Sequence, residues 1–168
     1  MSIRVRIAAL SDLPIIHNLI RDSFAAMDRH SCLGKALWLR AAEDLITSEL
    51  SSGAFEATYL DKGVDRCFWV AEMADVGGVI GCVGMKRKTG KHSQDAELVR
   101  MAVSPEHRGK GYGAVLVNEV VSHCRNTLPG VERIVLTTGN PDSANFYVKK
   151  AGFKDYNYFF FHSCVLVL

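Results

Sequence analysis

Hydrophobic and polar positions along this chain follow the periods of both strands and helices. Strict alternation predicts a half-buried strand over residues 3–7, and short apolar runs predict further strands over residues 67–71, 78–85, 98–103 and 134–138. Apolar residues at helical spacing predict helices over residues 11–24, 36–50, 114–126 and 143–151. Residues 153–168 alternate and then become almost wholly apolar, which predicts one or two closing antiparallel strands. This order of elements indicates a mixed α/β sheet in one domain, residues 1–168.

Turn and cap residues support these boundaries. Pro14 lies in the first turn of the first helix, Ser51 to Gly53 end the second, and Asp75-Val76-Gly77 join two strands. Gly152 ends the last helix as the residue after its final turn.

The composition is that of an ordinary globular protein. Of the 168 residues, 48% are hydrophobic and 23% are charged, and the net charge of +2 is too small to indicate nucleic-acid binding. No apolar run is long enough to span a membrane and no signal peptide opens the chain, so we expect a soluble, cytoplasmic protein. The five cysteines, which have no metal-binding spacing, are expected to be reduced core residues, and no metal is expected.

One stretch carries the strongest chemical signal. The apolar strand that ends at Val103 and Pro105 leads into Arg108-Gly109-Lys110-Gly111-Tyr112-Gly113, and an amphipathic helix follows. Glycines permit positive φ and close approach of a ligand to the backbone, and the amino end of a helix presents unpaired N–H groups. These features predict a phosphate or pyrophosphate site.

The glycine spacing narrows the class of site. It fits neither a P-loop nor a Rossmann fingerprint. Instead, Arg108-x-x-Gly111-x-Gly113 preceded by Val103-x-Pro105 closely resembles the acyl-CoA-binding motif of the GNAT superfamily of acetyl-CoA-dependent N-acetyltransferases.

Two further blocks extend this resemblance. Residues 140–153, from Asn140 through Phe146-Tyr147 to Gly152-Phe153, resemble the second block of the family, and residues 4–14 resemble its first strand and turn. Residues 28–65 have no recognisable counterpart. The resemblance implies the GNAT fold: a mixed, mostly antiparallel central sheet of about six to seven strands flanked by about four helices.

The resemblance also implies a donor, acetyl-CoA, and the residues that would hold it. In the family the central strand is bulged, so that its main chain pairs with pantetheine and one N–H points at the thioester oxygen, here that of Met101. The implied cofactor-binding residues are Met101, Ala102, Val103, Arg108, Gly109, Lys110, Gly111, Tyr112, Gly113, Asn140 and Tyr147.

Two residues match catalytic positions of the family. Glu97 matches the glutamate base of histone acetyltransferases, although a strand-end glutamate in water and proton transfer through ordered water are the alternatives. Tyr147 matches the tyrosine that protonates the CoA thiolate, and its alternative is a packed helix tyrosine. Asn140 matches an asparagine that binds the pantetheine arm or steadies the tyrosine, and its alternative is a turn residue before Pro141. Arg100 would hold an acceptor carboxylate or pair with a neighbouring acid.

The expected activity is direct transfer of an acetyl group from acetyl-CoA to a primary amine in a ternary complex. Residues 68–72 and 136–140 look similar to the subgroup that acetylates small amino acids and cysteine conjugates, and the linker 27–35 is where acceptor choice could reside. The enzymatic alternative is a protein lysine or N-terminal acetyltransferase, and the alternative of another class is a non-catalytic acyl-CoA sensor. The expected partner is an amine-bearing small molecule or peptide, with no nucleic acid and no membrane, and a homodimer is left open.

Overall fold

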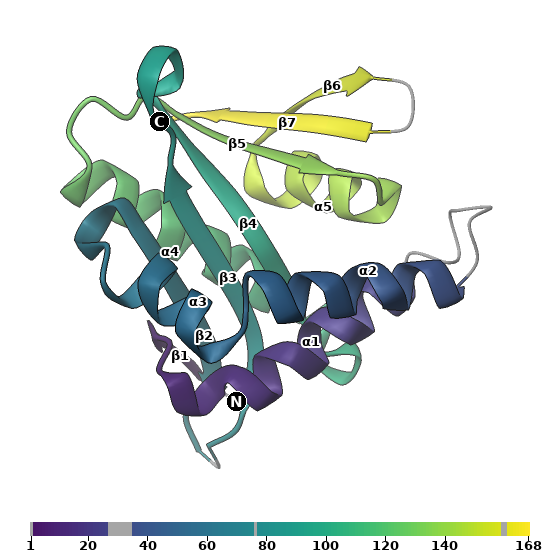
Figure 1. Ribbon diagram of the computed structural model, residues 1–168. Helices are drawn as coiled ribbons and strands as arrows, with labels where there is room; N and C mark the ends of the chain where they lie inside the picture. Colours follow the sequence, from purple (N-terminus) through teal and green to yellow (C-terminus); the bar gives the residue numbers. More distant parts are fainter. Residues whose placement is uncertain (1, 27–34, 76, 159–160) are drawn as a thin grey trace.

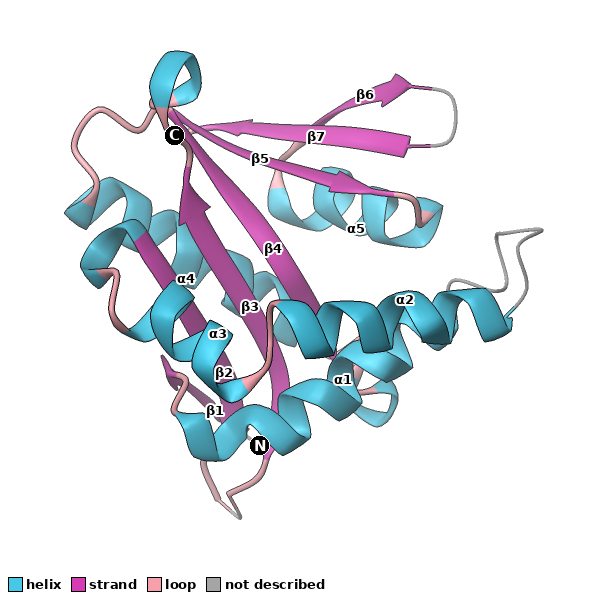
Figure 2. Cartoon of the chain, viewed as in Figure 1, coloured by secondary structure: helices cyan, strands magenta, loops and turns pink. Residues whose placement is uncertain are grey.

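The protein is an open seven-stranded sheet with helices on both faces (Figures 1 and 2). The computed structural model describes residues 2–26, 35–75, 77–158 and 161–168. The strand order is β1-β2-β3-β4-β5-β7-β6, and every neighbouring pair is antiparallel except β4 and β5, which run parallel. The strands are β1 (Ile3–Ile7), β2 (Arg66–Met73), β3 (Val79–Arg87), β4 (Asp95–Val103), β5 (Arg133–Thr138), β6 (Lys154–Tyr158) and β7 (Phe161–Val167). The predicted mixed sheet is confirmed.

Five α-helices lie in the described part of the chain. They are α1 (Leu13–Ala25), α2 (Lys35–Ser48), α3 (Ser52–Phe55), α4 (Tyr112–Thr127) and α5 (Pro141–Ala151). Four of them were predicted within a few residues. The second helix, α2, ends at Ser48, shortly before the predicted end at Ser51 to Gly53. The next helix, α3, was not predicted: it begins directly after Ser51 and continues as a π-helical turn over Glu56–Leu60. Phe55 and Tyr59, four residues apart, are both buried, and their burial holds this segment on the sheet.

The sheet separates two hydrophobic cores. On one face, α1, α2, α3 and the π-turn pack on strand residues such as Phe68, Val70 and Ala102. On the other face, α4 and α5 pack on the strand residues that alternate with these, such as Trp69 and Ala71. Side chains of a strand alternate between faces, so the continuous apolar runs of β2 and β3 supply both cores at once.

Four of the five cysteines behave as predicted. Cys67, Cys82, Cys124 and Cys164 are buried free thiols. Burial raises the pKa of each of these thiols, to about 12 for Cys82. They therefore stay protonated and act as small apolar residues. Cys32, the linker 27–34, Val76 and residues 159–160 of the aromatic run lie outside the described residues.

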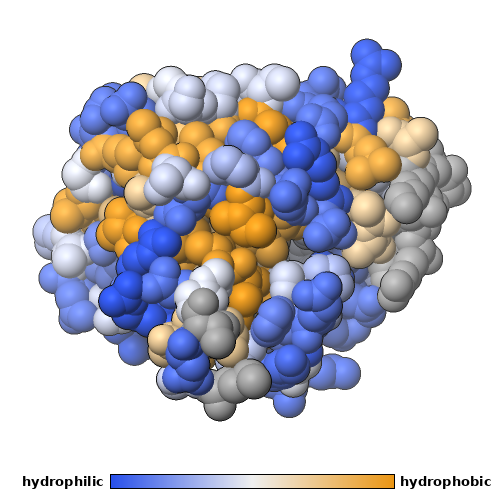
Figure 3. All heavy atoms as spheres, turned by 90° about the horizontal axis from the view of Figure 1, so that it is seen from below, coloured by the Kyte–Doolittle hydropathy of each residue, from blue (hydrophilic) through white to orange (hydrophobic). Residues whose placement is uncertain are grey.

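Part of the apolar surface remains exposed. The face seen from below carries hydrophobic side chains across its middle, with hydrophilic side chains around them (Figure 3). Large exposed hydrophobic residues include Ile7 of β1, Leu10, and Ile15 of α1. None of the described helices is long and apolar enough to cross a membrane.

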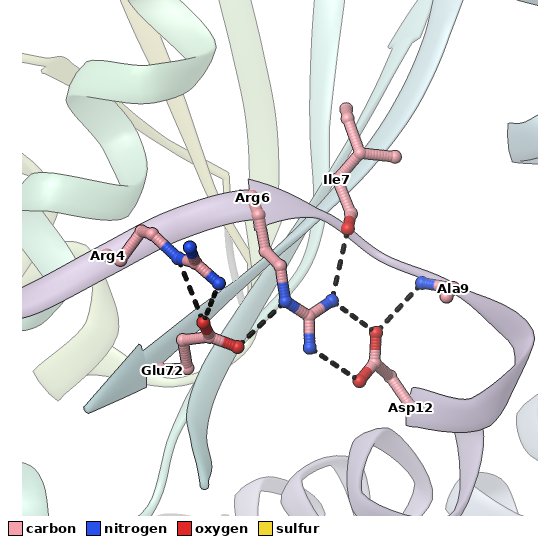
Figure 4. A network of polar contacts seen from close by, with 6 residues as sticks. All are labelled: Arg4, Arg6, Ile7, Ala9, Asp12 and Glu72. Carbon is pink, nitrogen blue, oxygen red and sulfur yellow. Dashed lines mark hydrogen bonds and ion pairs between the residues drawn. The ribbon is translucent and has the colours of Figure 1, made fainter. Parts of the chain in front are cut away.

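A charged network ties the first strand to the sheet and to the start of α1 (Figure 4). Arg6 donates from Nη1 and Nη2 to the two carboxylate oxygens of Asp12, at 2.7 and 2.9 Å, and from Nε to Glu72 at 2.8 Å. The Ala9 N–H also donates to Asp12, at 2.8 Å. The hydrogen bond from Arg6 holds the pKa of the nearly buried Asp12 below its usual value. Arg4 also pairs with Glu72, but its side chain is 69% exposed.

This network predicts that substitution of Arg6 and substitution of Arg4 lower the free energy of unfolding by different amounts. Arg6→Ala should lower the free energy of unfolding by about 3 kcal/mol, because it leaves Asp12 charged and largely buried without its partner. Arg4→Ala, the matched control on the same strand, should lower it by less than about 1 kcal/mol, because exposed ion pairs contribute little. Urea unfolding at neutral pH measures both. Equal effects of the two substitutions would contradict this account.

Candidate active site

The site begins where two neighbouring strands separate. β4 and β5 pair only over their first three residues, Asp95–Glu97 with Arg133–Val135. Beyond this point β4 stays paired with β3 on one side but has no strand partner on its β5 side, whereas β5 stays paired with β7 to its end at Thr138. Figure 1 shows the two strands diverging into a V. The backbone of residues 98–103 therefore borders the opening on the side where a strand partner would otherwise lie.

The central strand is also bulged at this opening. Cys82 pairs with Ala102 and Gly84 with Val99, so β4 holds one residue more than β3 between these pairs. Arg100 has φ 54°, which makes it the one described residue other than glycine with positive φ. Met101 follows it and packs on the α4–α5 side. The bulge that the family resemblance implied is thus present at Met101.

The glycine-rich turn forms the second wall. Gly111 is the N-cap of α4 with φ 87°, and Gly109 has φ 76°. A Cβ atom built on either would meet nothing within 4 Å, so a ligand could approach both backbones. Gly113, the third glycine of the turn, is not among the glycines with positive φ. Its hydrogen makes room for neighbours, because a Cβ there would lie 3.0 Å from Met101 Cε and 3.1 Å from Phe146 Cζ.

These walls enclose a cleft of about 780 Å³. It lies between the end of β4, the turn before α4, and helix α5 along most of its length, and it reaches Ser23 and Ala26 at the end of α1. Its volume is in the range of small-molecule sites. Ten of the predicted residues line it: Met101, Ala102, Val103, Arg108, Gly109, Gly111, Tyr112, Gly113, Asn140 and Tyr147. Two predicted residues, Lys110 and Glu97, are not among its lining residues.

Tyr147 joins α5 to the bulged strand. Its hydroxyl donates to Met101 Sδ at 3.4 Å, and its ring packs edge-on against Phe146 and Phe153. Burial raises the pKa of this phenol well above its usual value, so the hydroxyl keeps its proton at neutral pH. Tyr147 is therefore both a packed core residue and a proton-bearing group that lines the cleft.

Asn140 has a clear structural task. Its side-chain oxygen accepts from the N–H groups of Asp142 and Ser143, at 2.9 and 3.4 Å, and so caps α5. A contact of Asn140 with a ligand stays a prediction.

Glu97 lies on the other face of the sheet from Tyr147. It is paired across the strands with Lys86, on the side of α2, and is partly exposed. Among the described residues none forms a hydrogen bond or ion pair with its carboxylate. A carboxylate without such a partner is available to a proton donor from that side.

Sequence reasoning missed several residues of the cleft. Lys149 and Lys150, in the last turn of α5, line it together with Arg108 and add positive charge to it. His107, to which no role was assigned, also lines it and is bonded through Nδ1 to Ser104 Oγ at 2.8 Å. The sequence held a signal for Lys150: it lies four residues after Phe146 of the recognised block, and residues four apart lie on one face of a helix.

A second missed group lies on the α2 face beside the bulge. Glu49 accepts from Arg100 Nη2 at 2.7 Å, from the Tyr59 hydroxyl at 2.8 Å and from Lys86 Nζ. Burial alone would raise the pKa of Glu49, but the hydrogen bonds from Arg100, Lys86 and Tyr59 outweigh it and bring that pKa to about 2. Arg100 thus pairs with a neighbouring acid, the second of the two roles considered for it.

Comparison with known proteins identifies the class. The model of the acetyltransferase (GNAT) family matches residues 27–153, which is most of the chain. The chain therefore belongs to the GNAT acetyltransferase family, and the sheet described above is the GNAT fold. The match includes residues 28–65, for which no counterpart was recognised in the sequence.

Two curated relatives are N-acetyltransferases by name. N-acetyltransferase 8B of Homo sapiens is 31% identical over 132 residues, and N-acetyltransferase family 8 member 2 of Rattus norvegicus is 28% identical over 131 residues. Each alignment covers 77% of this chain and 56% of the relative, so the chain spans about half the length of these relatives.

Solved structures share the fold at lower identity. The PaiA N-acetyltransferase from Thermoplasma acidophilum, in complex with coenzyme A, superposes with a TM-score of 0.77 at 21% identity over 100% of both chains. The spermidine N-acetyltransferase from Vibrio cholerae, in complex with CoA and spermine, gives 0.61 at 20% identity over 98% of this chain and 95% of its own.

The Glu49 group predicts an acid-dependent stability. Because the pKa of Glu49 is lower in the folded chain than its ordinary value of 4.5, the ionised carboxylate stabilises the fold above that value and loses this effect as the pH falls toward 2. Glu49→Gln should lower the free energy of unfolding at pH 7 by up to about 3 kcal/mol, and the difference from wild type should shrink between pH 5 and pH 2.

Urea unfolding at a series of pH values measures this difference. Glu56→Gln is the matched control, since that glutamate is exposed, and it should change stability by less than about 0.5 kcal/mol. A Glu49→Gln effect that is constant from pH 7 to pH 2 would disprove the charge-based account.

Proposed function

We propose that residues 1–168 form one acetyltransferase domain that moves an acetyl group from acetyl-CoA to a primary amine by direct transfer in a ternary complex. The observation that carries the proposal is the convergence of three parts on one cleft. These are the open edge of β4 with its bulge at Met101, the glycine-rich N-terminus of α4, and the phenol of Tyr147. Membership of an acetyltransferase family and the names of the curated relatives support it.

The residues present fit the donor. Gly109 and Gly111 leave open backbone beside the first unpaired N–H groups of α4, which suits a pyrophosphate. Arg108 is fixed by its Nε–H donation to the Val103 carbonyl at 3.0 Å, and it adds positive charge to the cleft together with the two lysines of α5. The free edge of residues 101–103 suits the amide-bearing arm of CoA, which could pair with it as a further strand.

Three groups of this chain would divide the chemistry. The Met101 N–H donates to the thioester oxygen as that oxygen gains charge. Glu97 receives or relays the proton of the amine, because a lysine-like amine with a pKa of about 10.4 is otherwise protonated at neutral pH. Tyr147 gives its proton to the departing thiolate. Glu97 and Tyr147 lie on opposite faces of the sheet, which supports entry of the amine from the α2 side and of the cofactor from the α5 side.

The acceptor is proposed to be a small amine, amino acid or conjugate. The names of the curated relatives support N-acetyl transfer in general, and a small amine as acceptor is supported by a fold neighbour, a spermidine N-acetyltransferase in complex with CoA and spermine. A protein lysine or amino terminus is the enzymatic alternative, and a homodimer stays a prediction.

Ligand-dependent stability tests the donor. At about one hundred times the Kd, acetyl-CoA should stabilise the native chain by about 2.7 kcal/mol and raise the midpoint of thermal unfolding by roughly 5–10 °C. ATP and NAD are the controls and should give no comparable shift. Thiol release is then measured with amino acids, cysteine conjugates, polyamines and a lysine peptide as acceptors. Absence of any shift at saturating acetyl-CoA would refute the proposed function.

Two substitutions separate an enzyme from a sensor. Tyr147→Phe and Glu97→Gln should each lower kcat by about 10²-fold while the Kd for acetyl-CoA stays within about threefold, because each removes a proton carrier and keeps the shape of the side chain. Tyr156→Phe is the matched control, since Tyr156 is exposed on β6 outside the cleft, and it should leave kcat unchanged. A wild-type chain that binds acetyl-CoA but releases no thiol with any acceptor would support the non-catalytic alternative.

A further inference from the structure

The bulge at Arg100 is unusual in its residue. A bulge of this kind places its first residue in the left-handed region, where glycine is the ordinary choice. Arg100 holds φ 54° although this conformation is unfavourable for a residue with a Cβ. Its Nε–H is also buried, and none of the described residues accepts a hydrogen bond from it. Two local costs at one position indicate that something else holds the residue there.

The bulge directs two consecutive residues to one face. Val99 faces the α2 side, because a Cβ on Gly84 would lie 3.0 Å from Val99 Cγ2 and 2.9 Å from Phe68. Arg100 also reaches that side, where it meets Glu49. The side chain of the next residue, Met101, turns to the α5 side, where its sulfur accepts a hydrogen bond from the Tyr147 hydroxyl. The conformation of Arg100 therefore sets how Met101 is presented to the cleft.

Glu49 is well placed to hold Arg100. It follows directly after α2. The next residue, Leu50, is fully buried, and its carbonyl oxygen accepts a hydrogen bond from His17 Nε2 at 2.8 Å. Tyr59, which donates to the same carboxylate, is wedged against Phe55 and Phe68 with ring centroids 5.2 and 5.0 Å away. The carboxylate that meets Arg100 is thus fixed from both sides by core packing.

Arg100 itself does not line the cleft, whereas the three residues after it do. We propose that Glu49 and Arg100 are positioning residues. Their ion pair locks the left-handed backbone at position 100 and thereby aims the Met101 N–H at the thioester oxygen. This inference rests on the proposed function only for its effect on turnover. Its effect on the backbone of Met101 is a property of the free protein.

Two substitutions, Arg100→Gly and Arg100→Ala, distinguish a role of Arg100 in fixing the bulge from a role in contacting the acceptor. Arg100→Ala removes the ion pair and keeps the strain of positive φ, so the bulge should relax and the Met101 N–H should move. Arg100→Gly also removes the ion pair, but glycine adopts positive φ without strain, so the bulge should persist. If Arg100 instead touched the acceptor, both substitutions would remove that contact alike.

The first measurement is NMR of the free chain labelled with [¹⁵N]methionine, which labels only the five methionines. Met101→Leu identifies the Met101 amide signal. Arg100→Ala and Glu49→Gln should shift or broaden this signal, and Arg100→Gly should return it close to its wild-type position. In the Arg100→Gly background, Glu49→Gln should have no further effect, because the coupled partner is already absent. Circular dichroism checks that each variant is folded at the temperature used.

The second measurement is turnover with an acceptor found by the thiol-release screen. Arg100→Ala should lower kcat by about 10- to 100-fold with the Kd for acetyl-CoA within about threefold, whereas Arg100→Gly should keep kcat within about threefold of wild type. Equal loss in both variants with an unchanged Met101 signal would overturn the proposal and assign Arg100 to the acceptor. If the wild-type chain shows no turnover but the Met101 signal follows the expected order, the proposed function fails and the lock stands.

Discussion

One extra residue in the central strand sets the geometry of the whole cleft. Without the bulge, β4 would keep its alternation, and Met101 would face α2 rather than α5. With the bulge, the alternation of side chains between the two faces is shifted by one residue after Arg100. Ala102 therefore joins the core on the side of α1–α3, and Met101 meets Tyr147 on the other side. The separation of β4 from β5 begins just before this point and leaves the reoriented backbone open.

The two faces of the sheet then take on different electrostatic characters around the same strand. On the α5 face, the N-terminus of α4 and the cations Arg108, Lys149 and Lys150 favour an anionic ligand. On the α2 face, two cations are already neutralised in part by Glu49, and Glu97 adds an acidic group without a partner among the described residues. A polyanionic donor and a cationic amine would thus be favoured on opposite sides of β4, which limits their competition for one site.

Local patterns predicted most of the elements because they record local physics. The alternation of residues 3–7 and the helical spacing around Leu116 and Val120 report which side of an element is buried, and both were placed correctly. The glycines at 109 and 111 were found because positive φ next to a helix start is a property of a few adjacent residues. The family motif then brought in Tyr147, which no periodicity distinguishes from a core residue.

What sequence could not supply depends on contacts distant along the chain. Glu49, Lys86 and Arg100 come from α2's end, β3 and β4, and nothing in their own surroundings marks them as a group. Gly113 lines the cleft, and its missing side chain also makes room for Met101 and Phe146, which only the packed structure brings together. The helical turn after Ser51 was missed because Ser and Gly usually end a helix, whereas here burial of Phe55 and Tyr59 outweighs that preference.

The choice of arginine over glycine at the bulge also has a physical consequence for coupling. Glycine would allow the same φ, but it has no side chain, so the conformation of the bulge would not depend on contacts with residues on the α2 face. Arginine makes the bulge depend on Glu49, and Glu49 moves with the end of α2 and with the π-turn that carries Tyr59. In the proposed mechanism, a displacement of α2 would be transmitted, through one ion pair and one strained residue, to the backbone that is proposed to face the thioester. The strain at Arg100 would make this transmission sensitive, because in this proposal the left-handed conformation persists only while the partner that stabilises it stays in place.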